Sequence, residues 1–419
     1  MNNVDPQPEF LQFECSGCQT KLKVPKASVG PAGVKCPKCG QVNATEAVQK
    51  PQLVGEAPII DVEKVEPKVV SPPATHASSG LAPSGLPKPL LPTSPSNQGR
   101  ETAVSRLYKN ITDEIAKLFV GQEELVMGTL VALFSGGHVL IESVPGLGKT
   151  LFVRTLGKVL GCKFGRIQFT ADLMPSDVTG APIFNMKTQE FVFRPGPIFT
   201  QLLLADEINR APAKTHAALL EIMQEKNVTI DGKTHELDPP FLVLATQNPI
   251  ESEGTYNLPE AQLDRFMFKL VADYPDADQE SEILMLHSSQ TDLDRRLESE
   301  VQKIASPEDI VKVTQENSNV RVDPLLVEYI NKMVRLTRQW PQFYMGASPR
   351  AGISLMQGAR TLAAFCGRDY AVPDDVVTIA RPTLRHRVML TAEAEVEGQS
   401  VDQLLSDLIR SIEVPRIKV

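Results

Sequence analysis

Short apolar runs alternate with helix-period segments over residues 101–272. Four runs have the length of buried strands, at residues 139–141, 163–169, 201–206 and 241–246. Two segments between them repeat their apolar positions every three to four residues, as amphipathic helices do, at residues 151–160 and 213–225. Strands that alternate with helices predict an α/β fold, in which a parallel sheet is flanked by helices.

Two hairpins are expected within this alternating pattern. Apolar and polar residues alternate on both sides of residues 187–189, which predicts an antiparallel pair of strands. Asp231 and Gly232 lie between segments rich in β-branched residues, and an Asp-Gly pair is typical of a type I′ hairpin turn.

Helical periodicity dominates both ends of the folded segment. Residues 101–137 contain two helical patterns, broken at Val120 and Gly121. Residues 273–419 are predicted to form a second, all-helical domain, with a loop at residues 340–345. Helix starts are expected there at Pro324, Ser348 and Pro373.

Four cysteines near the N-terminus have metal-ligand spacing. Two Cys-x-x-Cys pairs are separated by 17 residues, which lets four thiolates meet at one tetrahedral Zn²⁺. A segment this small has no apolar core that would fold it otherwise. We therefore predict a zinc-ribbon domain at residues 1–45, with a redox-sensing thiol cluster as the alternative. The predicted zinc ligands are Cys15, Cys18, Cys36 and Cys39.

A proline-rich segment follows the zinc module. Ten prolines lie between Pro51 and Pro95, and residues 46–100 contain no Phe, Tyr or Trp. Such a composition buries too little apolar surface to offset its ordering entropy, so we predict a disordered linker at residues 46–100.

Composition narrows the function classes. A net charge of −8 argues against bulk affinity for nucleic acid, which depends on Lys and Arg. There is no apolar stretch long enough to span a membrane and no secretion signal, so a cytoplasmic protein is expected. Cys162 and Cys366, flanked by apolar residues, are expected to be buried packing residues, and His386 to lie at the surface or against a neighbouring domain.

The sequence SVPGLGKT at residues 143–150 predicts a phosphate-binding loop. It follows a buried strand and precedes a helix, so backbone N–H groups and the helix N-terminus converge on an anion. Lys149 would reach the β- and γ-phosphates of ATP, and the Thr150 hydroxyl would ligate Mg²⁺. The predicted nucleotide-binding residues of the loop are Val144, Pro145, Gly146, Leu147, Gly148, Lys149, Thr150 and Leu151.

Polar residues end two of the predicted strands. Asp206 and Glu207 follow the apolar run at residues 201–205, where Asp206 would bind Mg²⁺ through water and Glu207 would polarise the attacking water. Asn248 follows the strand at residues 241–246 and can orient that water.

Two arginines are further candidates. Arg265 ends a short helical stretch after Pro259, where a solvated salt bridge is the alternative role. Ser348, Pro349 and Arg350 have the order of an N-cap, a first-turn Pro and a first-turn cation. Because that cation opposes the helix dipole, an external anion such as the γ-phosphate would explain it.

Four long segments resemble motifs of the MoxR-family AAA+ ATPases, in the family's order: VPGLGKT, LLLADEINRAPAKTHAALLEIMQE, LATQNPIESEGTYNLPEAQLDRF and ASPRAGISLMQGAR. The resemblance covers residues 104–419 and leaves out the predicted zinc ribbon and linker. The chain departs from the family at Ser143, where the phosphate-loop pattern has Gly, and at Ala171, where the family commonly has Pro.

The resemblance implies a ring, usually a hexamer, with ATP at the subunit interfaces. Lys149 and Thr150 match Walker A, and Asp206 and Glu207 match Walker B. Asn248 matches sensor 1, Arg265 the arginine finger given to the neighbouring subunit, and Arg350 sensor 2. The two hairpins match the helix-2 and pre-sensor-1 inserts shared with magnesium-chelatase ATPases and replicative helicases.

We therefore expect an ATPase that uses ATP, Mg²⁺ and Zn²⁺ and drives remodelling, maturation or cofactor insertion of a protein client. The resemblance further implies a partner with a von Willebrand factor A domain. The alternatives are a nucleic-acid motor, because related AAA+ proteins carry the same hairpins, and a nucleotide-gated interaction scaffold that works through the zinc ribbon. The negative charge speaks against the first, and the intact Glu207, Asn248 and Arg265 speak against the second.

Overall fold

The computed structural model describes residues 100–416, except 145, 249–255, 257 and 289–292, and the backbone of four strands within residues 10–43. It divides into two compact units, Met1–Pro83 and Ser84–Val419. In the first unit β1 (Phe10–Glu14) pairs antiparallel with β2 (Lys21–Pro25), and β3 (Val34–Lys35) pairs with β4 (Val42–Asn43). The four predicted zinc ligands and the predicted linker, apart from Arg100, lie outside the described residues.

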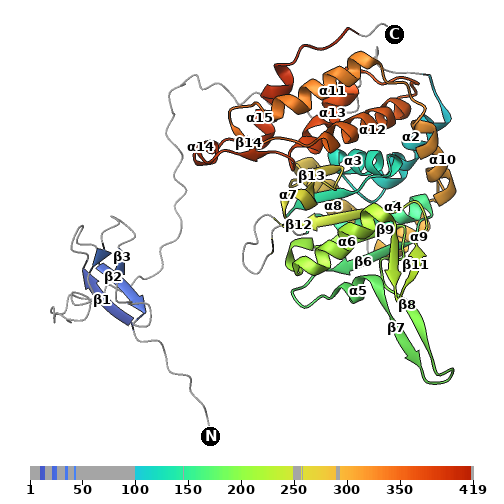
Figure 1. The fold of residues 1–419 in the computed structure, drawn as a ribbon, viewed down its shortest axis with the longest axis horizontal. Helices are drawn as coiled ribbons and strands as arrows, with labels where there is room; N and C mark the ends of the chain where they lie inside the picture. Colours follow the sequence, from blue (N-terminus) through green and yellow to red (C-terminus); the bar gives the residue numbers. More distant parts are fainter. Residues whose placement is uncertain are drawn as a thin grey trace. The chain divides into compact units, whose positions relative to one another are not determined.

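A five-stranded parallel sheet forms the centre of the second unit (Figure 1). Its strand order is β13-β5-β12-β9-β6. The strands are β5 (Val139–Ser143), β6 (Phe164–Gln168), β9 (Leu202–Asp206), β12 (Leu242–Gln247) and β13 (Phe268–Ala272). The four predicted strands are confirmed, whereas β13 was not expected.

Successive residues of the central strands enter two hydrophobic clusters on opposite faces of the sheet. Leu202 and Leu204 of β9 belong to one cluster, and Leu203 and Ala205 belong to the other. This follows from the two-residue side-chain period of a strand, and it explains why β9 is apolar at each of these positions. The larger cluster also contains apolar residues within 108–134, 152–162 and 297–412, and the smaller one contains residues within 219–223.

The helices begin and end as follows: α2 (Ala103–Ala116), α3 (Glu123–Phe134), α4 (Lys149–Leu160), α5 (Pro175–Thr179), η3 (Ile208–Arg210), α6 (Ala213–Glu225), α7 (Glu260–Leu263), α8 (Ala277–Ser288), α9 (Leu293–Glu300), α10 (Pro307–Asn317), α11 (Pro324–Thr337), α12 (Pro349–Phe365), α13 (Pro373–Leu384), α14 (Ala392–Val396) and α15 (Val401–Arg410). The break predicted near Val120 and the three C-terminal helix starts are confirmed. Among the described residues, no helix has the length and apolarity needed to cross a bilayer.

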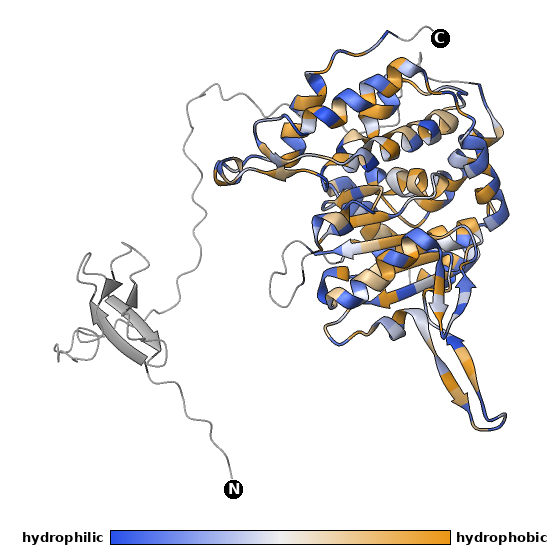
Figure 2. Cartoon of the chain, in the orientation of Figure 1, coloured by the Kyte–Doolittle hydropathy of each residue, from blue (hydrophilic) through white to orange (hydrophobic). Residues whose placement is uncertain are grey.

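Both predicted hairpins are present. Strands β7 (Gly180–Asn185) and β8 (Glu190–Pro195) form one that projects from the body and carries exposed apolar residues (Figures 1 and 2). Strands β10 (Asn227–Ile230) and β11 (Lys233–Glu236) form the other. Its turn residues Asp231 and Gly232 have φ values of 50° and 73°, as a type I′ turn requires.

One local expectation needs correction. The predicted loop at residues 340–345 ends in a short strand, β14 (Phe343–Met345), because β15 (Met389–Leu390), which follows α12 and α13 in the chain, pairs with it. Of the two positions expected for His386, the structure has the second: the residue is 7% exposed and lies against residues 101–272, where its Nε2 donates to the Phe266 carbonyl oxygen at 3.0 Å. Cys162 is buried, as expected, and Cys366 is partly buried.

Candidate nucleotide site

The sheet order brings the predicted chemistry to one edge. Strand β12 pairs in parallel with β5 on one side and with β9 on the other. The carboxyl ends of parallel neighbours meet at the same edge of a sheet, which is where open α/β sheets bind ligands. The phosphate loop after β5, the carboxylates at the end of β9 and Asn248 after β12 are therefore gathered at one place.

The described part of the predicted phosphate loop has the backbone that an anion cradle needs. Gly146 and Gly148 have φ values of 90° and 71°, in the left-handed region that favours glycine. Helix α4 then begins at Lys149, so its N-terminal N–H groups face the loop. Pro145 lies outside the described residues.

Lys149 is held by the residue that departs from the family pattern. Its ammonium donates to the Oγ of Ser143 at 2.8 Å, and Ser143 is 2% exposed at the end of β5. Burial lowers the pKa of Lys149, while the negative charges of Asp206 and Glu207 act in the opposite direction. The ammonium is thus partly desolvated and has one hydroxyl partner, which suits a group that exchanges this partner for phosphate oxygens.

The carboxylate of Asp206 is fixed from both neighbouring strands. Thr246 of β12 donates its hydroxyl to Oδ1 at 2.6 Å, and Arg166 of β6 lies 2.7 Å from Oδ2. Oxygen ligands of this kind are those that Mg²⁺ prefers, and the magnesium would be bound here together with the phosphates.

Glu207 has an unusual backbone and a well-defined side chain. Its φ of 55° is rare for a residue with a side chain, and its N–H donates to the Thr246 hydroxyl at 2.8 Å. Its Oε2 accepts from Gln168 at 2.6 Å and lies 3.1 Å from Nε of Arg210. The carboxylate therefore follows a turn of rare backbone conformation, and its Oε2 has two donors.

A cavity of about 400 Å³ adjoins the phosphate loop. Gly146, Leu147, Gly148 and Leu151 form one side of it. The remaining wall comes from the segments before α3 and before α8 and from α8 itself, and includes Val120, Gln122, Tyr274, Pro275, Ile283 and His287. The cavity is lined mostly by apolar residues with a few polar ones, and it lies next to the phosphate loop. Both features suit the base and ribose of a nucleotide.

The two candidate arginines lie elsewhere in the unit. Arg265 follows α7 and donates to the Leu220 carbonyl oxygen of α6 at 2.8 Å. Arg350 is exposed at the second position of α12, and its N–H donates to the Ser348 Oγ at 3.1 Å. The predicted order of N-cap, Pro and cation is confirmed, whereas the contacts of these arginines among the described residues do not include the phosphate loop.

Several residues of the site were not found from the sequence. Arg166, Gln168 and Thr246 contact the carboxylates from adjacent strands, and Thr246 lies at the end of the apolar run of β12. The cavity wall could be suspected only at Val120, where the helical pattern breaks. The partners of Asp206 and Glu207 come from strands far apart in sequence, so only the strand order could reveal them.

Comparison with known proteins agrees with this geometry. The model of the "ATPase family associated with various cellular activities (AAA)" matches residues 138–268, and that of the "AAA lid domain" matches residues 335–408. The Bacillus subtilis protein named "Uncharacterized protein YeaC" is 46% identical over 309 residues, which are 74% of this chain and 95% of that protein.

Two further similarities extend over most of both chains. "Chaperone MoxR1" of Mycobacterium tuberculosis is 42% identical over 313 residues, 73% of this chain and 81% of that protein. The crystal structure of a candidate ATPase from Cytophaga hutchinsonii superposes with a TM-score of 0.69 at 42% identity, covering 75% of this chain and 96% of that one. The chain therefore belongs to the MoxR family of AAA+ ATPases, and it is an ATP-hydrolysing enzyme.

Proposed function

We propose that this ATPase works as a ring, in which hydrolysis at the carboxyl edge of the sheet drives remodelling or maturation of a protein client. The observation that carries the proposal is the convergence of Lys149, Asp206, Glu207 and Asn248 at the ends of three adjacent parallel strands. The name of the Mycobacterium relative, a chaperone, supports the client.

Each residue has a distinct role in the proposed reaction. The loop amides and Lys149 bind the phosphates, and Thr150 and Asp206 would hold Mg²⁺, which supplies charge neutralisation on the phosphate oxygens. Glu207 takes the proton from the attacking water, and Asn248 orients that water. The Thr246 hydroxyl joins Asp206 to the backbone of Glu207, so it keeps the metal-binding and the water-activating carboxylates in register.

Arg265 is proposed to complete the site of the neighbouring subunit, and Arg350 that of its own. A mixing experiment tests this arrangement. Arg265→Ala subunits keep an intact nucleotide site but donate no finger, whereas Lys149→Ala subunits donate a finger but do not bind the phosphates. Each variant alone should be inactive, and an equimolar mixture should hydrolyse ATP. A mixture as inactive as its components would contradict the shared site.

The client can be identified by affinity purification of two variants, one that retains ATP and one that does not bind it. Glu207→Gln should retain ATP and hold its client, and Lys149→Ala should not. The family resemblance makes a protein with a von Willebrand factor A domain the expected partner. Recovery of such a protein with Glu207→Gln but not with Lys149→Ala would support the proposal. Recovery of nucleic acid with Glu207→Gln would instead favour a nucleic-acid motor.

We further propose that the N-terminal unit binds one Zn²⁺ through four thiolates. The connection between β1 and β2 contains Cys15 and Cys18, and that between β3 and β4 contains Cys36 and Cys39. Two short antiparallel pairs, each with one Cys-x-x-Cys in its connection, support a zinc ribbon.

A further inference from the structure

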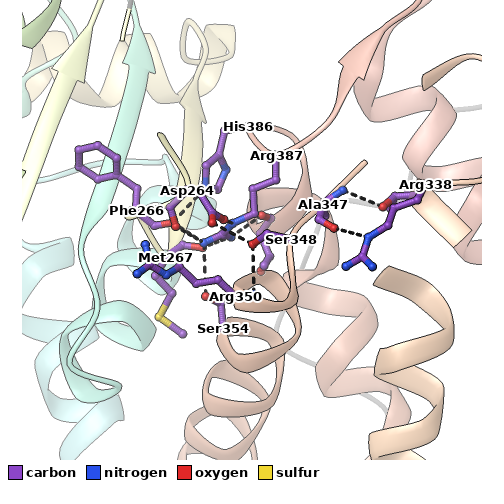
Figure 3. Close-up of polar contacts among 12 residues, drawn as sticks. Asp264, Phe266, Met267, Arg338, Ala347, Ser348, Arg350, Ser354, His386 and Arg387 are labelled. Carbon is purple, nitrogen blue, oxygen red and sulfur yellow. Dashed lines mark hydrogen bonds and ion pairs between the residues drawn. The ribbon is translucent and has the colours of Figure 1, made fainter. Parts of the chain in front are cut away.

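Arg387, which follows α13, donates hydrogen bonds to the backbone on both sides of the proposed finger residue Arg265 (Figure 3). Its Nη2 donates to the carbonyl oxygens of Asp264, at 3.1 Å, and Phe266, at 2.7 Å, and its Nη1 donates to that of Met267 at 3.1 Å. The side chain of Arg387 is 1% exposed. A buried guanidinium with these partners fixes the backbone of residues 264–267 relative to the C-terminal helices.

The carboxylate of Asp264 connects Arg387 to the helix that carries Arg350. Its Oδ1 accepts from Nε of Arg387 at 2.7 Å, and its Oδ2 accepts from the Ser348 hydroxyl at 2.8 Å. Ser348 is the N-cap of α12, and its Oγ also accepts from the N–H of Arg350. The carboxylate of Asp264, the residue before Arg265, therefore contacts both Arg387 and the N-cap of the helix that carries Arg350.

Two other contacts tie the same elements together. Nη2 of Arg387 lies 3.4 Å from Oγ of Ser354 in α12, and Nε2 of His386 donates to the Phe266 carbonyl oxygen. The segment around Arg265 is thus held by residues of the C-terminal helices and of the chain that follows α13.

We infer that Asp264, Ser348 and Arg387 are positioning residues that couple the start of α12 to the placement of Arg265. This inference rests on the proposed roles of Arg265 and Arg350. Because Ser348 caps the helix that carries Arg350 and Asp264 directly precedes Arg265, the contact between them sets the position of the finger offered to the neighbouring subunit.

The test uses the mixture of finger donors and acceptors described above. A further substitution is added only to the Lys149→Ala subunit, which donates the finger. This subunit binds no nucleotide, so the added substitution cannot act through its own Arg350 and nucleotide. Ser348→Ala removes the contact with Asp264, and Ser348→Thr keeps a hydroxyl. Ser306→Ala is the matched control, because Ser306 also caps a helix that begins with Pro but contacts Asp309 instead. Rates are normalised to the amount of mixed assembly found by native mass spectrometry.

The donor with Ser348→Ala should lower the ATPase rate of the mixture at least fivefold relative to the donor with Ser306→Ala, and Ser348→Thr should restore it. Asp264→Asn in the donor should lower the rate as well. Equal rates with the Ser348→Ala and Ser306→Ala donors would overturn the coupling while leaving the shared site intact. An inactive mixture of the two parent variants would overturn the trans role of Arg265 and the coupling with it.

Discussion

Single hydroxyl groups organise the charged residues of the site. The Thr246 hydroxyl joins Asp206 to the backbone of Glu207, and the Ser143 hydroxyl is the partner of the Lys149 ammonium. The sequence predicted the charged residues themselves, because their order along the chain is characteristic. It did not predict Thr246 or Gln168, because a threonine in a strand and a glutamine at a strand end have no signature of their own.

Ser143→Ala should strengthen ATP binding about fivefold. The substitution removes the acceptor of the partly buried Lys149 ammonium, which raises the free energy of the nucleotide-free state by about 1 kcal/mol. The phosphates of ATP supply the missing acceptors, so the bound state loses less. Calorimetric titration measures the dissociation constant, and thermal unfolding without nucleotide should show a lower melting temperature.

The same substitution in a Lys149→Ala background is the control for the change in melting temperature. The partner of Ser143 is then absent, so Ser143→Ala should leave the melting temperature unchanged. Unchanged ATP affinity of Ser143→Ala, with an unchanged melting temperature, would show that the bond between Lys149 and Ser143 does not restrain the lysine.

At the scale of elements, the periodicity and turn residues of a segment predicted those helices and turns that depend on the segment's own sequence. Helix α6 has the predicted bounds, and the turn at Asp231 and Gly232 has the predicted type. Strand β14 was missed, because its partner β15 is distant in the sequence. Strand β13 was also missed, because it is an edge strand in which buried and half-buried residues alternate, so it has no continuous apolar run like those of β9 and β12. A strand that is short or only half-buried thus gives too weak a pattern to be identified before its partner is known.

His138, the residue before β5, connects this strand to α6 and β12. Its Nε2 donates to the Met223 carbonyl oxygen at the end of α6 at 3.0 Å, and its Nδ1 accepts from the N–H of Val243 in β12 at 3.1 Å. Burial lowers the pKa of His138 to about 4. A protonated ring could not accept from Val243, so the folded protein keeps this histidine neutral.

Stability should therefore fall as the pH is lowered from about 6.5 towards 4. In this range the unfolded chain binds a proton at His138 that the folded protein excludes, so the free energy of unfolding decreases by on the order of 3 kcal/mol. Denaturant unfolding across this range measures the change. His138→Gln, which can donate and accept without titrating, should have a smaller pH dependence than the parent protein. An identical slope for both would show that His138 does not contribute.

The whole molecule combines a nucleotide-hydrolysing unit with a small N-terminal unit. The AAA+ fold and the helical lid could be predicted, because four motifs in order identify the family. The packing between them could not: the C-terminal helices share one hydrophobic cluster with one face of the sheet, and the contacts of Asp264 depend on three segments that are far apart in the sequence.

The N-terminal unit should contain one zinc ion per chain. Elemental analysis of the purified full chain should give a zinc-to-protein ratio near one, and Cys15→Ser with Cys36→Ser should reduce it to near zero, since two thiolates do not hold Zn²⁺ tightly. Cys162→Ser with Cys366→Ser is the matched control and should leave the ratio unchanged. Absence of zinc from protein purified without chelators would contradict the zinc ribbon.

The most direct test of the account is hydrolysis by Glu207→Gln. The amide keeps the shape of the side chain and its contact with Arg210 or Gln168, but it cannot take a proton from water. We predict unaltered ATP binding with a rate of hydrolysis reduced at least a hundredfold, as for loss of a general base. Glu221→Gln, on the exposed face of α6, should hydrolyse ATP normally. If Glu207→Gln turned over ATP at the rate of the parent protein, the reaction would not take place at the carboxyl edge as described.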